Sequence, residues 1–331
     1  MEFRDFTAGK DDDGRRLDRI IRIFLKDLSM GQIYKLLRKG LIKLNDKKAK
    51  PDSHVNQGDK ISIAAFLFDN GNSGEENKNL SQTAPSSELK IVFEDQHLLI
   101  IDKPYGRSVH GSQGAGQPGL DKDVLAYYES KKSQKSDSLA FRPGPLHRLD
   151  RNTTGLLVFS MSMEGARWFS ESIKNHTVQK KYLGLALGNI KNQELWEDNL
   201  IDSDKTENGF YTVSQADDKN SADSRLAITT VTPLAHGQFN GNPVTLAEYA
   251  IKTGRKHQIR AQSQIHGFPL LGDKAYGSCL SQKLSREYYL HAYSLTFPEN
   301  NPLELQQEIK IGLSPDFINQ LECCEIENPG L

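Results

Sequence analysis

The sequence predicts an α+β protein made of two domains of unequal size. Two short helical patterns and a few short strands fall within residues 14–64. Residues 69–88 are rich in Asn, Ser, Gly and Glu and contain too few apolar residues to form a core. From residue 89, strand-like runs alternate with helical patterns to the end of the chain. We therefore expect a small N-terminal α/β domain (residues 1–68, core 14–64), a flexible linker (69–88) and a larger mixed-sheet domain (89–331).

The expected small domain begins with two helices. Ser29 reads as the N-cap of the second helix, with Gln32 as its capping-box partner, and Gly40 should end that helix. Short strands are expected at residues 41–44 and 60–63, with a turn after the first. The first helix is indicated by an apolar stripe at helical spacing, formed by Leu17, Ile20, Ile21, Phe24, Leu25 and Leu28.

Basic residues are concentrated in this small domain. The whole chain has a formal net charge of −1, which alone argues against nucleic-acid binding. Between residues 14 and 60, however, 13 Lys and Arg face only five acids, a net charge of +8. Such an asymmetry of charge indicates a domain that binds a polyanion, although the same charges could belong to solvated helix faces.

The larger domain shows several apolar runs. Strand-like runs occupy residues 89–104, 155–161 and 180–188. A helical pattern lies at residues 164–174, and residues 129–139 and 202–224 look like surface insertions. This mixture favours a single α+β unit.

Several protein classes are not expected. The first ten residues are charged and contain no apolar run, so we expect no secretion signal. No stretch approaches the roughly 20 apolar residues of a membrane span. The three cysteines, Cys279, Cys323 and Cys324, show no zinc-site spacing and cannot form a disulfide framework. We therefore expect a reducing, cytoplasmic compartment, no membrane partner and a monomer.

The first candidate for chemistry is a carboxylate, Asp150, in the segment PGPLHRLDRNTTGLLVFS (residues 143–160). It lies in a loop between turn signals and precedes an apolar strand, so it can be presented at the end of that strand. Taken alone, Asp150 could equally cap its own turn through side-chain hydrogen bonds.

Two further segments carry polar groups. Residues 252–277, KTGRKHQIRAQSQIHGFPLLGDKAYG, hold a basic cluster that could cover a solvated face, balance Asp150 or hold phosphates. The cluster is followed by the turn residues Gly267, Pro269, Gly272 and Asp273. Its His, Gln and Arg residues show no metal-ligand spacing with a cysteine. The segment KKYLGLALG opens a strand with Tyr182, which alone would be an ordinary strand aromatic.

Together these segments resemble the RluA-type family of pseudouridine synthases. The family's HRLDxxTSGLL appears as HRLDRNTTGLL, its GRTHQIRxH as GRKHQIRAQ, and its opening ILYEDDxLLVIDKPxG as IVFEDQHLLIIDKPYG. The family's LHA also appears, at residues 290–292, and the resemblance covers residues 89–319. Two positions depart from the pattern: Thr154 replaces a serine, and Gln262 stands where the family has histidine. In the same way, residues 14–64 resemble the small RNA-binding domain first described in ribosomal small-subunit protein four.

The resemblance implies an isomerase that converts uridines in RNA to pseudouridine. Asp150 would be the catalytic carboxylate, acting either by attack on the sugar carbon or by taking a ribose proton; Arg260 would pair with it, and Tyr182 would stack on the base. Substrate-binding positions implied are His147, Arg148, Thr153, Thr154, Gly155, His257 and Gln258. Expected RNA-binding positions in the small domain are Arg15, Arg16, Arg19, Lys35, Arg38 and Lys39.

The reaction rearranges one molecule, so we expect no metal or nucleotide cofactor. The target base must be flipped out of any helix to be reached. RNA is the expected partner, as large-subunit ribosomal RNA or pre-ribosomal particles rather than transfer RNA. Two other classes stay open: a non-catalytic RNA-binding protein, which would be expected to lack Asp150 or Arg260, and a carboxylate glycosidase, which normally needs two acids.

Overall fold

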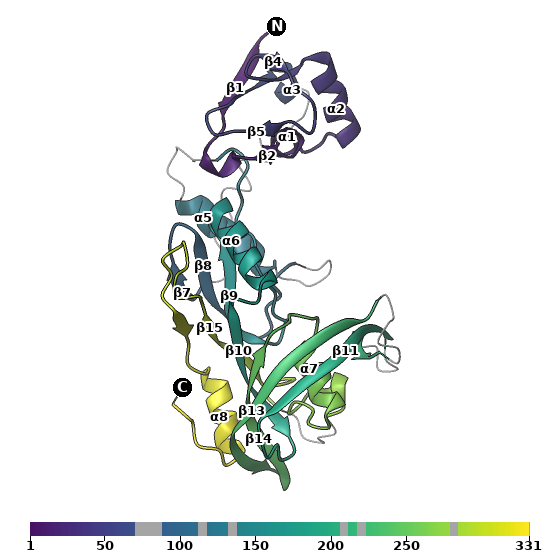
Figure 1. Cartoon of the computed structure of the whole chain (residues 1–331), viewed down its shortest axis with the longest axis vertical. Coiled ribbons are helices and arrows are strands. Elements are labelled where there is room, and N and C mark those ends of the chain that lie inside the picture. The colour runs from purple at the N-terminus through teal and green to yellow at the C-terminus, as the bar shows by residue number, and fades with distance from the viewer. Residues whose placement is uncertain are drawn as a thin grey trace.

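The computed structural model describes residues 1–69, 88–111, 118–131, 138–205, 211–216, 223–278 and 284–330. The N-terminal domain lies at one end of an elongated molecule, next to α5 and α6 of the larger domain (Figure 1). Most of the predicted linker, residues 70–87, and Cys279 lie outside the described residues. No helix in the described ranges is long and apolar enough to cross a membrane.

The N-terminal domain packs two helices against a four-stranded sheet. Its elements are β1 (Phe3–Thr7), η1 (Lys10–Asp12), β2 (Arg15–Arg16), α1 (Leu17–Phe24), α2 (Met30–Lys39), β3 (Ile42–Leu44), β4 (Lys47–Lys48), β5 (His54–Val55), β6 (Lys60–Ala64) and α3 (Phe66–Asp69). The sheet order is β1-β6-β3-β4. The apolar stripe of α1 is buried with Ile33 and Leu37 of α2 and with Ile61 and Ile63 of β6.

The predicted boundaries of α2 are confirmed. The Ser29 side chain accepts from the Gln32 amide, the Gln32 side chain accepts from the Ser29 amide, and Gly40 ends the helix with φ of +72°. The sequence did not predict β1, which adds to the sheet by antiparallel pairing with β6. Its partner lies more than 50 residues away, so no local pattern shows the pairing.

The larger domain is built on one long sheet. Its elements are β7 (Ile91–Glu94), β8 (Leu98–Lys103), α5 (Leu120–Lys131), β9 (Thr154–Ser160), α6 (Met163–Lys174), β10 (Gln179–Leu187), β11 (Glu194–Lys205), β12 (Tyr211–Gln215), β13 (Arg225–Phe239), β14 (Asn242–Ile251), α7 (Gln258–Ile265), η2 (Lys274–Tyr276), β15 (Leu290–Thr296), β16 (Glu308–Lys310) and α8 (Pro315–Cys323). The order is β12-β11-β13-β14-β10-β15-β9-β8-β7, and β16 pairs with β15. The pairing of β9 with β15 is parallel, whereas the other strand pairings of this sheet, in the residues that the structure describes, are antiparallel.

Both faces of this sheet are covered. Alternate residues of a strand point to opposite faces, and in β8 Leu98 and Ile100 join one apolar cluster while Leu99 and Ile101 join another. The first cluster contains Phe169 of α6. The second contains residues of α5 and α7 and lies beneath the candidate site.

The expectation of surface insertions was partly wrong. Residues 129–131 continue α5, and Ser138 is buried. Residues 202–205 and 211–215 belong to the paired strands β11 and β12. Their polar composition is compatible with an edge hairpin, because only one face of such a strand needs to be apolar.

Candidate active site

Asp150 lies on a loop that leads into β9. Leu146 first pairs with Val158, its amide donating to that carbonyl at 2.8 Å, so residues 145–146 run beside β9. A tight turn follows, in which the Thr153 amide donates to the Asp150 carbonyl at 3.1 Å. The Asp150 side chain is 18% exposed and makes no hydrogen bond with another described residue. Its carboxylate is therefore available to a substrate.

A buried lysine holds this loop from below. Lys103, the last residue of β8, is fully buried and donates from Nζ to the carbonyl of Arg151 at 2.8 Å and of Thr153 at 2.7 Å. It also donates to its neighbour Pro104. Burial lowers the pKa of Lys103 to about 7, although the negative charge of Asp150 acts in the opposite direction. The loop that presents Asp150 is thus fixed through its backbone.

A buried acid orients the cation that faces Asp150. Asp273 is 1% exposed and accepts two hydrogen bonds from Arg260, at 2.7 Å from Nε and 2.8 Å from Nη2. The remaining Nη1 lies 3.7 Å from Oδ2 of Asp150. Burial lowers the pKa of Arg260, but the hydrogen bonds and charge of Asp273 outweigh it and raise the pKa above its ordinary value. Arg260 was predicted to pair with Asp150 and lies within ion-pair distance of it. Its bidentate partner, however, is Asp273, which the sequence had shown only as a turn residue.

Aromatic rings confine the Arg260 guanidinium. Its central carbon lies 4.4 Å from the ring centroid of Tyr288 and 4.9 Å from that of Tyr276. The Tyr276 hydroxyl accepts from the Val213 amide, so its own hydrogen is free to be donated to Nδ1 of His257, 2.9 Å away. This arrangement favours the tautomer of His257 with its proton on Nε2, which lies 3.8 Å from Oδ1 of Asp150. Burial lowers the pKa of His257 and so favours its neutral form.

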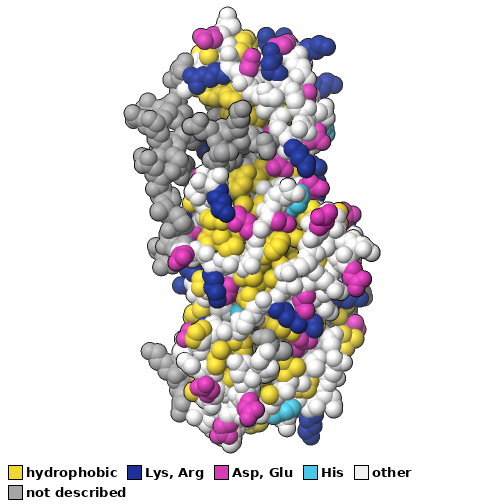
Figure 2. All heavy atoms as spheres, turned by 90° about the vertical axis from the view of Figure 1, so that its left-hand side faces the viewer, with side chains coloured by type: hydrophobic (Ala, Val, Ile, Leu, Met, Phe, Trp, Pro, Cys, Tyr) yellow, Lys and Arg dark blue, Asp and Glu magenta, His cyan; other side chains and the backbone are white. Residues whose placement is uncertain are grey.

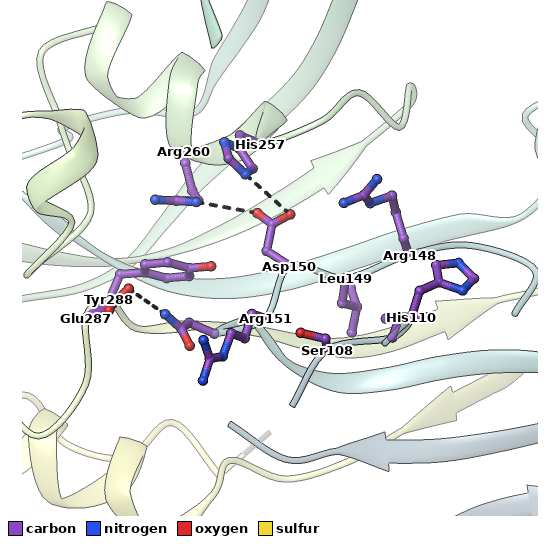
Figure 3. Close-up of a pocket in the computed structure, with 12 residues that line it drawn as sticks. Ser108, His110, Arg148, Leu149, Asp150, Arg151, His257, Arg260, Glu287 and Tyr288 are labelled. Carbon is purple, nitrogen blue, oxygen red and sulfur yellow. Dashed lines mark hydrogen bonds and ion pairs between the residues drawn. The ribbon is translucent and has the colours of Figure 1, made fainter. Parts of the chain in front are cut away.

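These groups line a cavity of about 280 Å³. Figure 3 shows Asp150 between Arg260 and His257, with Arg148 and Tyr288 close by. The cavity is lined by Ser108, Val109, His110, Arg148, Leu149, Asp150, Arg151, Asn152, His257, Arg260, Glu287 and Tyr288. Two loops are joined at its rim, where the Asn152 side chain donates to Glu287 at 2.5 Å. Only four of these positions were predicted from the sequence: Arg148, Asp150, His257 and Arg260.

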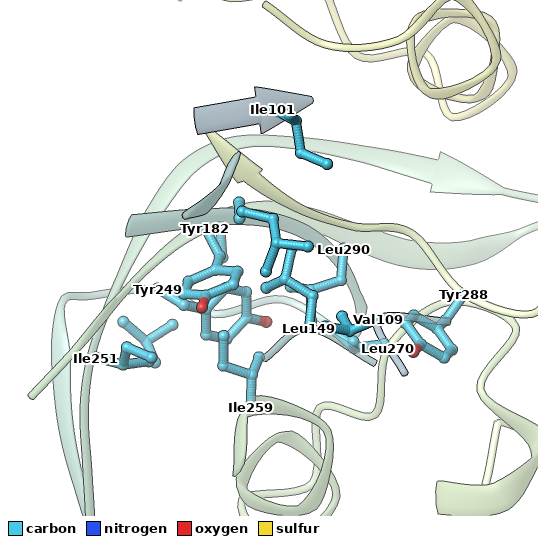
Figure 4. Packing of buried hydrophobic residues seen from close by; sticks show 14 of the residues in the cluster. Ile101, Val109, Leu149, Tyr182, Tyr249, Ile251, Ile259, Leu270, Tyr288 and Leu290 are labelled. Atoms are coloured by element: carbon cyan, nitrogen blue, oxygen red, sulfur yellow. The ribbon is translucent and has the colours of Figure 1, made fainter. Parts of the chain in front are cut away.

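Tyr182 lies beneath the cavity rather than in its lining. Its ring is 6% exposed and belongs to the apolar cluster that also contains Leu149 and Tyr249, its partner on β14 (Figure 4). Burial, and secondly the charge of Asp150, raise the pKa of the Tyr182 hydroxyl. The phenol therefore stays protonated near neutral pH.

Several predicted substrate contacts have structural partners instead. His147 accepts from the Val158 amide at 3.2 Å and stacks on Phe169, on the side of β9 that faces α6. Burial lowers its pKa to about 3, so it is neutral. Gln258 accepts from the hydroxyl of Thr253 and the amide of Arg255 and donates to β13. Neither residue lines the cavity: His147 points to the α6 side of β9, and Gln258, the first residue of α7, is turned toward β13.

Thr153, Thr154 and Gly155 shape the start of β9. Thr153 contacts the Tyr288 hydroxyl at 3.3 Å, and Thr154 contacts Nδ1 of His291 at 2.8 Å. Gly155 has φ of +108°, and a Cβ there would lie 2.2 Å from the carbonyl oxygen of Ala292 on β15. Glycine is required because β9 and β15 approach closely at this point. These residues support the Asp150 loop and do not line the cavity.

Gln262, the departure from the family pattern, anchors α7. It is fully buried, donates to Asp198 at 2.7 Å and accepts from Thr229 at 2.6 Å. These partners lie on β11 and β13. The position therefore ties the helix that carries Arg260 to the sheet.

The predicted RNA-binding residues fall into two groups. Arg19, Lys35, Arg38 and Lys39 are exposed on α1 and α2. Arg16 is paired with Asp18 at 2.6 Å, and Arg15 is half-buried near Asp12 and Arg167, where burial lowers its pKa. In the space-filling view, several Lys and Arg side chains stand out at the N-terminal end of the molecule (Figure 2). Arg15 therefore lies against the larger domain instead of on the open basic surface.

Within the described ranges, no three His, Cys, Asp or Glu residues are grouped so that they could hold a metal ion. The donor set of the cavity, a carboxylate flanked by a guanidinium and an imidazole, is suited to acid–base or nucleophilic chemistry on a polar substrate.

A small basic domain, joined to a sheet-based domain whose cavity presents the carboxylate of Asp150, is the arrangement expected of an RNA-modifying enzyme. The family model described as RNA pseudouridylate synthase matches residues 97–264, and the S4 domain model matches residues 15–61. The chain belongs to the RNA pseudouridylate synthase family and is an RNA pseudouridine synthase with an S4 RNA-binding domain.

Curated relatives match along most of their length. The chain is 29% identical to ribosomal large subunit pseudouridine synthase C of Haemophilus influenzae, over 89% of this chain and 87% of the relative. It is also 29% identical to the uncharacterized RNA pseudouridine synthase YlyB of Bacillus subtilis, over 82% of each. Among solved structures, human RNA pseudouridylate synthase domain containing 1 has the same fold, with a TM-score of 0.56 and 23% identity over 73% of this chain and 90% of that one.

Proposed function

We propose that this enzyme isomerises uridines in large-subunit ribosomal RNA and that Asp150 is the carboxylate that reacts. The observation that supports this most directly is the arrangement around Asp150. Its carboxylate borders the cavity, faces Arg260 at 3.7 Å and His257 at 3.8 Å, and makes no hydrogen bond to another described residue.

The reaction needs such a group at one atom of the ribose. The bond from C1′ to N1 breaks, the uracil rotates, and a bond from C1′ to C5 forms. C5 then loses its proton and N1 gains one, so the product is an isomer of the substrate. An ionised Asp150 can add to C1′ or take a ribose proton, and both routes release uracil from the sugar while the cavity retains it.

Arg260 serves as the counterion of the Asp150 carboxylate. Because Asp273 takes two of its N–H groups, Arg260 cannot move fully onto Asp150 and block it. Tyr182 lies under the Asp150 loop, and its raised pKa disfavours a role as a phenolate base. Its proposed role is to support the base by stacking or to donate a hydrogen bond.

RNA binding is divided between the two domains. Arg148 and Arg151 are exposed cations of the cavity lining, and Arg148 is proposed to contact the backbone of the nucleotide that enters. Lys35, Arg38 and Lys39 supply phosphate contacts at the other end. Ribosomal RNA is favoured because ribosomal large subunit pseudouridine synthases match this chain over most of its length. We further propose that the enzyme works as a monomer in the cytoplasm, which size-exclusion chromatography and cell fractionation would test.

The test of the substrate is pseudouridine mapping of total RNA from cells with and without the gene. The proposal predicts that one or a few sites in large-subunit ribosomal RNA lose the modification. They should regain it when the parent gene is restored. Loss only from transfer RNA would contradict the substrate assignment while leaving the enzyme class intact.

A further inference from the structure

The two domains meet at a buried carboxylate. Asp12, in η1 of the N-terminal domain, is fully buried although no described cation pairs with it within ion-pair distance. Its Oδ1 accepts from the Ser138 hydroxyl at 2.8 Å and the Ala140 amide at 3.1 Å. Its Oδ2 accepts from the Leu139 amide at 2.7 Å. Three donors of the larger domain therefore converge on one side chain of the smaller domain.

Two neighbours of Asp12 extend the same contact. Asp11 accepts from the Met163 amide at 2.8 Å, at the N-terminus of α6, where a carboxylate is favoured by the helix dipole. Arg167, one turn further along α6, donates to the Asp13 carbonyl at 3.0 Å. Charge-assisted hydrogen bonds to a buried carboxylate are stronger than bonds between neutral groups.

Apolar packing accompanies these hydrogen bonds. Ala140 is 4% exposed and belongs to the core cluster of the N-terminal domain, and Leu139 packs against the same cluster. The segment that begins at Ser138 thus completes the core of the other domain. Its burial explains why Asp12 is shielded from water.

This contact lies far from the cavity. α6 begins just after the Ser160 end of β9, whereas Asp150 lies just before the Thr154 end. The seven residues of β9 that separate the two places span roughly 20 Å, at about 3.3 Å per residue. In Figure 1 the N-terminal domain adjoins α5 and α6, while α7, which carries Arg260, lies toward the other end of the molecule.

We propose that Asp12 is a latch that fixes the RNA-binding domain on the larger domain, and that the fixed separation helps to select which uridine enters the cavity. The second half of this proposal rests on the proposed function. When the Asp12 contact is formed, an RNA bound by the basic helices can place in the cavity only nucleotides that lie at a fixed distance from the bound segment. With the latch open, the domain still binds RNA, but at variable distances and with a lower effective concentration of the target.

The latch is tested by hydrogen exchange on the full-length protein. Asp12→Asn keeps the side-chain size but replaces one acceptor oxygen by a donor that faces donors. We expect exchange of the Leu139 and Ala140 amides to become at least about tenfold faster, since both have lost a charged acceptor. The matched control is Asp27→Asn, which removes the same charge from an exposed position of the same domain and should change nothing.

A second variant distinguishes loss of this contact from general misfolding. Ser138→Ala removes a donor from the other side of the contact, and both variants should keep the parent's circular dichroism spectrum. If the two residues act through one contact, the Leu139 amide of the double variant exchanges no more than about twofold faster than in Asp12→Asn alone. The Ala140 amide does not serve for this comparison, because it also donates to the Ser138 hydroxyl at 3.1 Å. Unchanged protection of residues 139–140 in Asp12→Asn would overturn the latch.

Selection is tested with two RNAs that carry the same target uridine. For a long ribosomal fragment, kcat/KM of Asp12→Asn should fall about tenfold, whereas for a short hairpin it should stay within about twofold. Equal effects on both RNAs, or no effect on either, would overturn the role in selection. If the parent enzyme converts neither RNA, the proposed function fails, and the exchange measurement still decides the latch.

Discussion

Replacing Asp273 by Asn should damage both stability and turnover, because Asp273 is the main partner of Arg260. Asp273 is 1% exposed, and it accepts two hydrogen bonds of 2.7 and 2.8 Å from a guanidinium that is itself 8% exposed. Removing one member of a buried ion pair generally costs about 3–5 kcal/mol. Asp150 lies 3.7 Å from Arg260 and can take over part of the interaction. We therefore expect the unfolding free energy to fall by about 3 kcal/mol, at the lower end of that range.

The same substitution should reduce turnover more than RNA binding. Without Asp273, Arg260 is free to turn its N–H groups onto Asp150 and form a direct hydrogen-bonded pair. The reacting carboxylate would then be occupied, and a pair worth about 3 kcal/mol in the site would slow single turnover by roughly 100-fold. The RNA affinity should change little, because Asp273 is buried and touches no solvent-exposed surface.

The assays are urea unfolding and single-turnover conversion of a ribosomal RNA fragment. Asp46→Asn is the matched control, since Asp46 pairs with Lys60 at 2.7 Å and the two side chains are 71% and 40% exposed. Exposed pairs contribute about 0–1 kcal/mol, so the control should be nearly neutral. If Asp273→Asn unfolds within 1 kcal/mol of the parent and turns over within about threefold, the role given to Asp273 is refuted.

Three further predictions follow from the supports of the site and from the basic domain. Gly155→Ala should lower the unfolding free energy by about 3 kcal/mol or more, because its Cβ would meet the Ala292 carbonyl. Gly312→Ala, with open space around it, is the control. Equal effects of the two substitutions in urea unfolding would contradict this reasoning. Lys103→Met should flatten the pH dependence of stability: the folded pKa of about 7 lies below the unfolded value, so the unfolded chain binds more protons between pH 7 and about 10, and the parent should gain stability as pH rises through that window. A parallel rise in the variant would count against this. Neutralising the exposed residues Lys35, Arg38 and Lys39 should weaken the dependence of RNA affinity on salt. The slope of log affinity against log salt concentration should fall in magnitude by about 0.7–0.9 per lost phosphate contact. An unchanged slope would mean that these residues belong to a solvated surface.

Much of the fold was accessible from local sequence patterns. The ends of α2 were predicted because a capping box and a C-terminal glycine act within a few residues. The first strands of the larger domain were predicted for a similar reason, since β8, β9 and β10 are continuous apolar runs. The pairing of β1 with β6 was not predicted, because strand partners far apart in sequence leave no local signal.

The candidate site was predicted less completely than the fold. Asp150, Arg148, His257 and Arg260 were selected from two motifs, and the structure brings them to one cavity. The direction of each side chain was harder to predict, and His147 turns to the opposite side of β9 from the cavity.

Partners that lie outside the motifs were missed. Asp273 was treated as a turn residue, although it follows the Arg260 helix closely and is the only acid in the second motif segment. Asp12 could not be recognised from the sequence, because two of its partners, Ser138 and Leu139, lie in a stretch that looked like a surface insertion and the third, Ala140, follows it directly. Asp12 is buried by contacts between distant segments, which composition and periodicity do not reveal.

The central claim is that the carboxylate of Asp150 performs the isomerisation. The most direct measurement is release of tritium from RNA labelled at C5 of uridine, under single-turnover conditions, with Asp150→Asn beside the parent. The substitution keeps the size of the side chain but removes its charge. We predict that release falls below detection while the variant keeps its unfolding free energy and RNA affinity. Release within about tenfold of the parent, a difference of only about 1.4 kcal/mol in the barrier, would contradict the account.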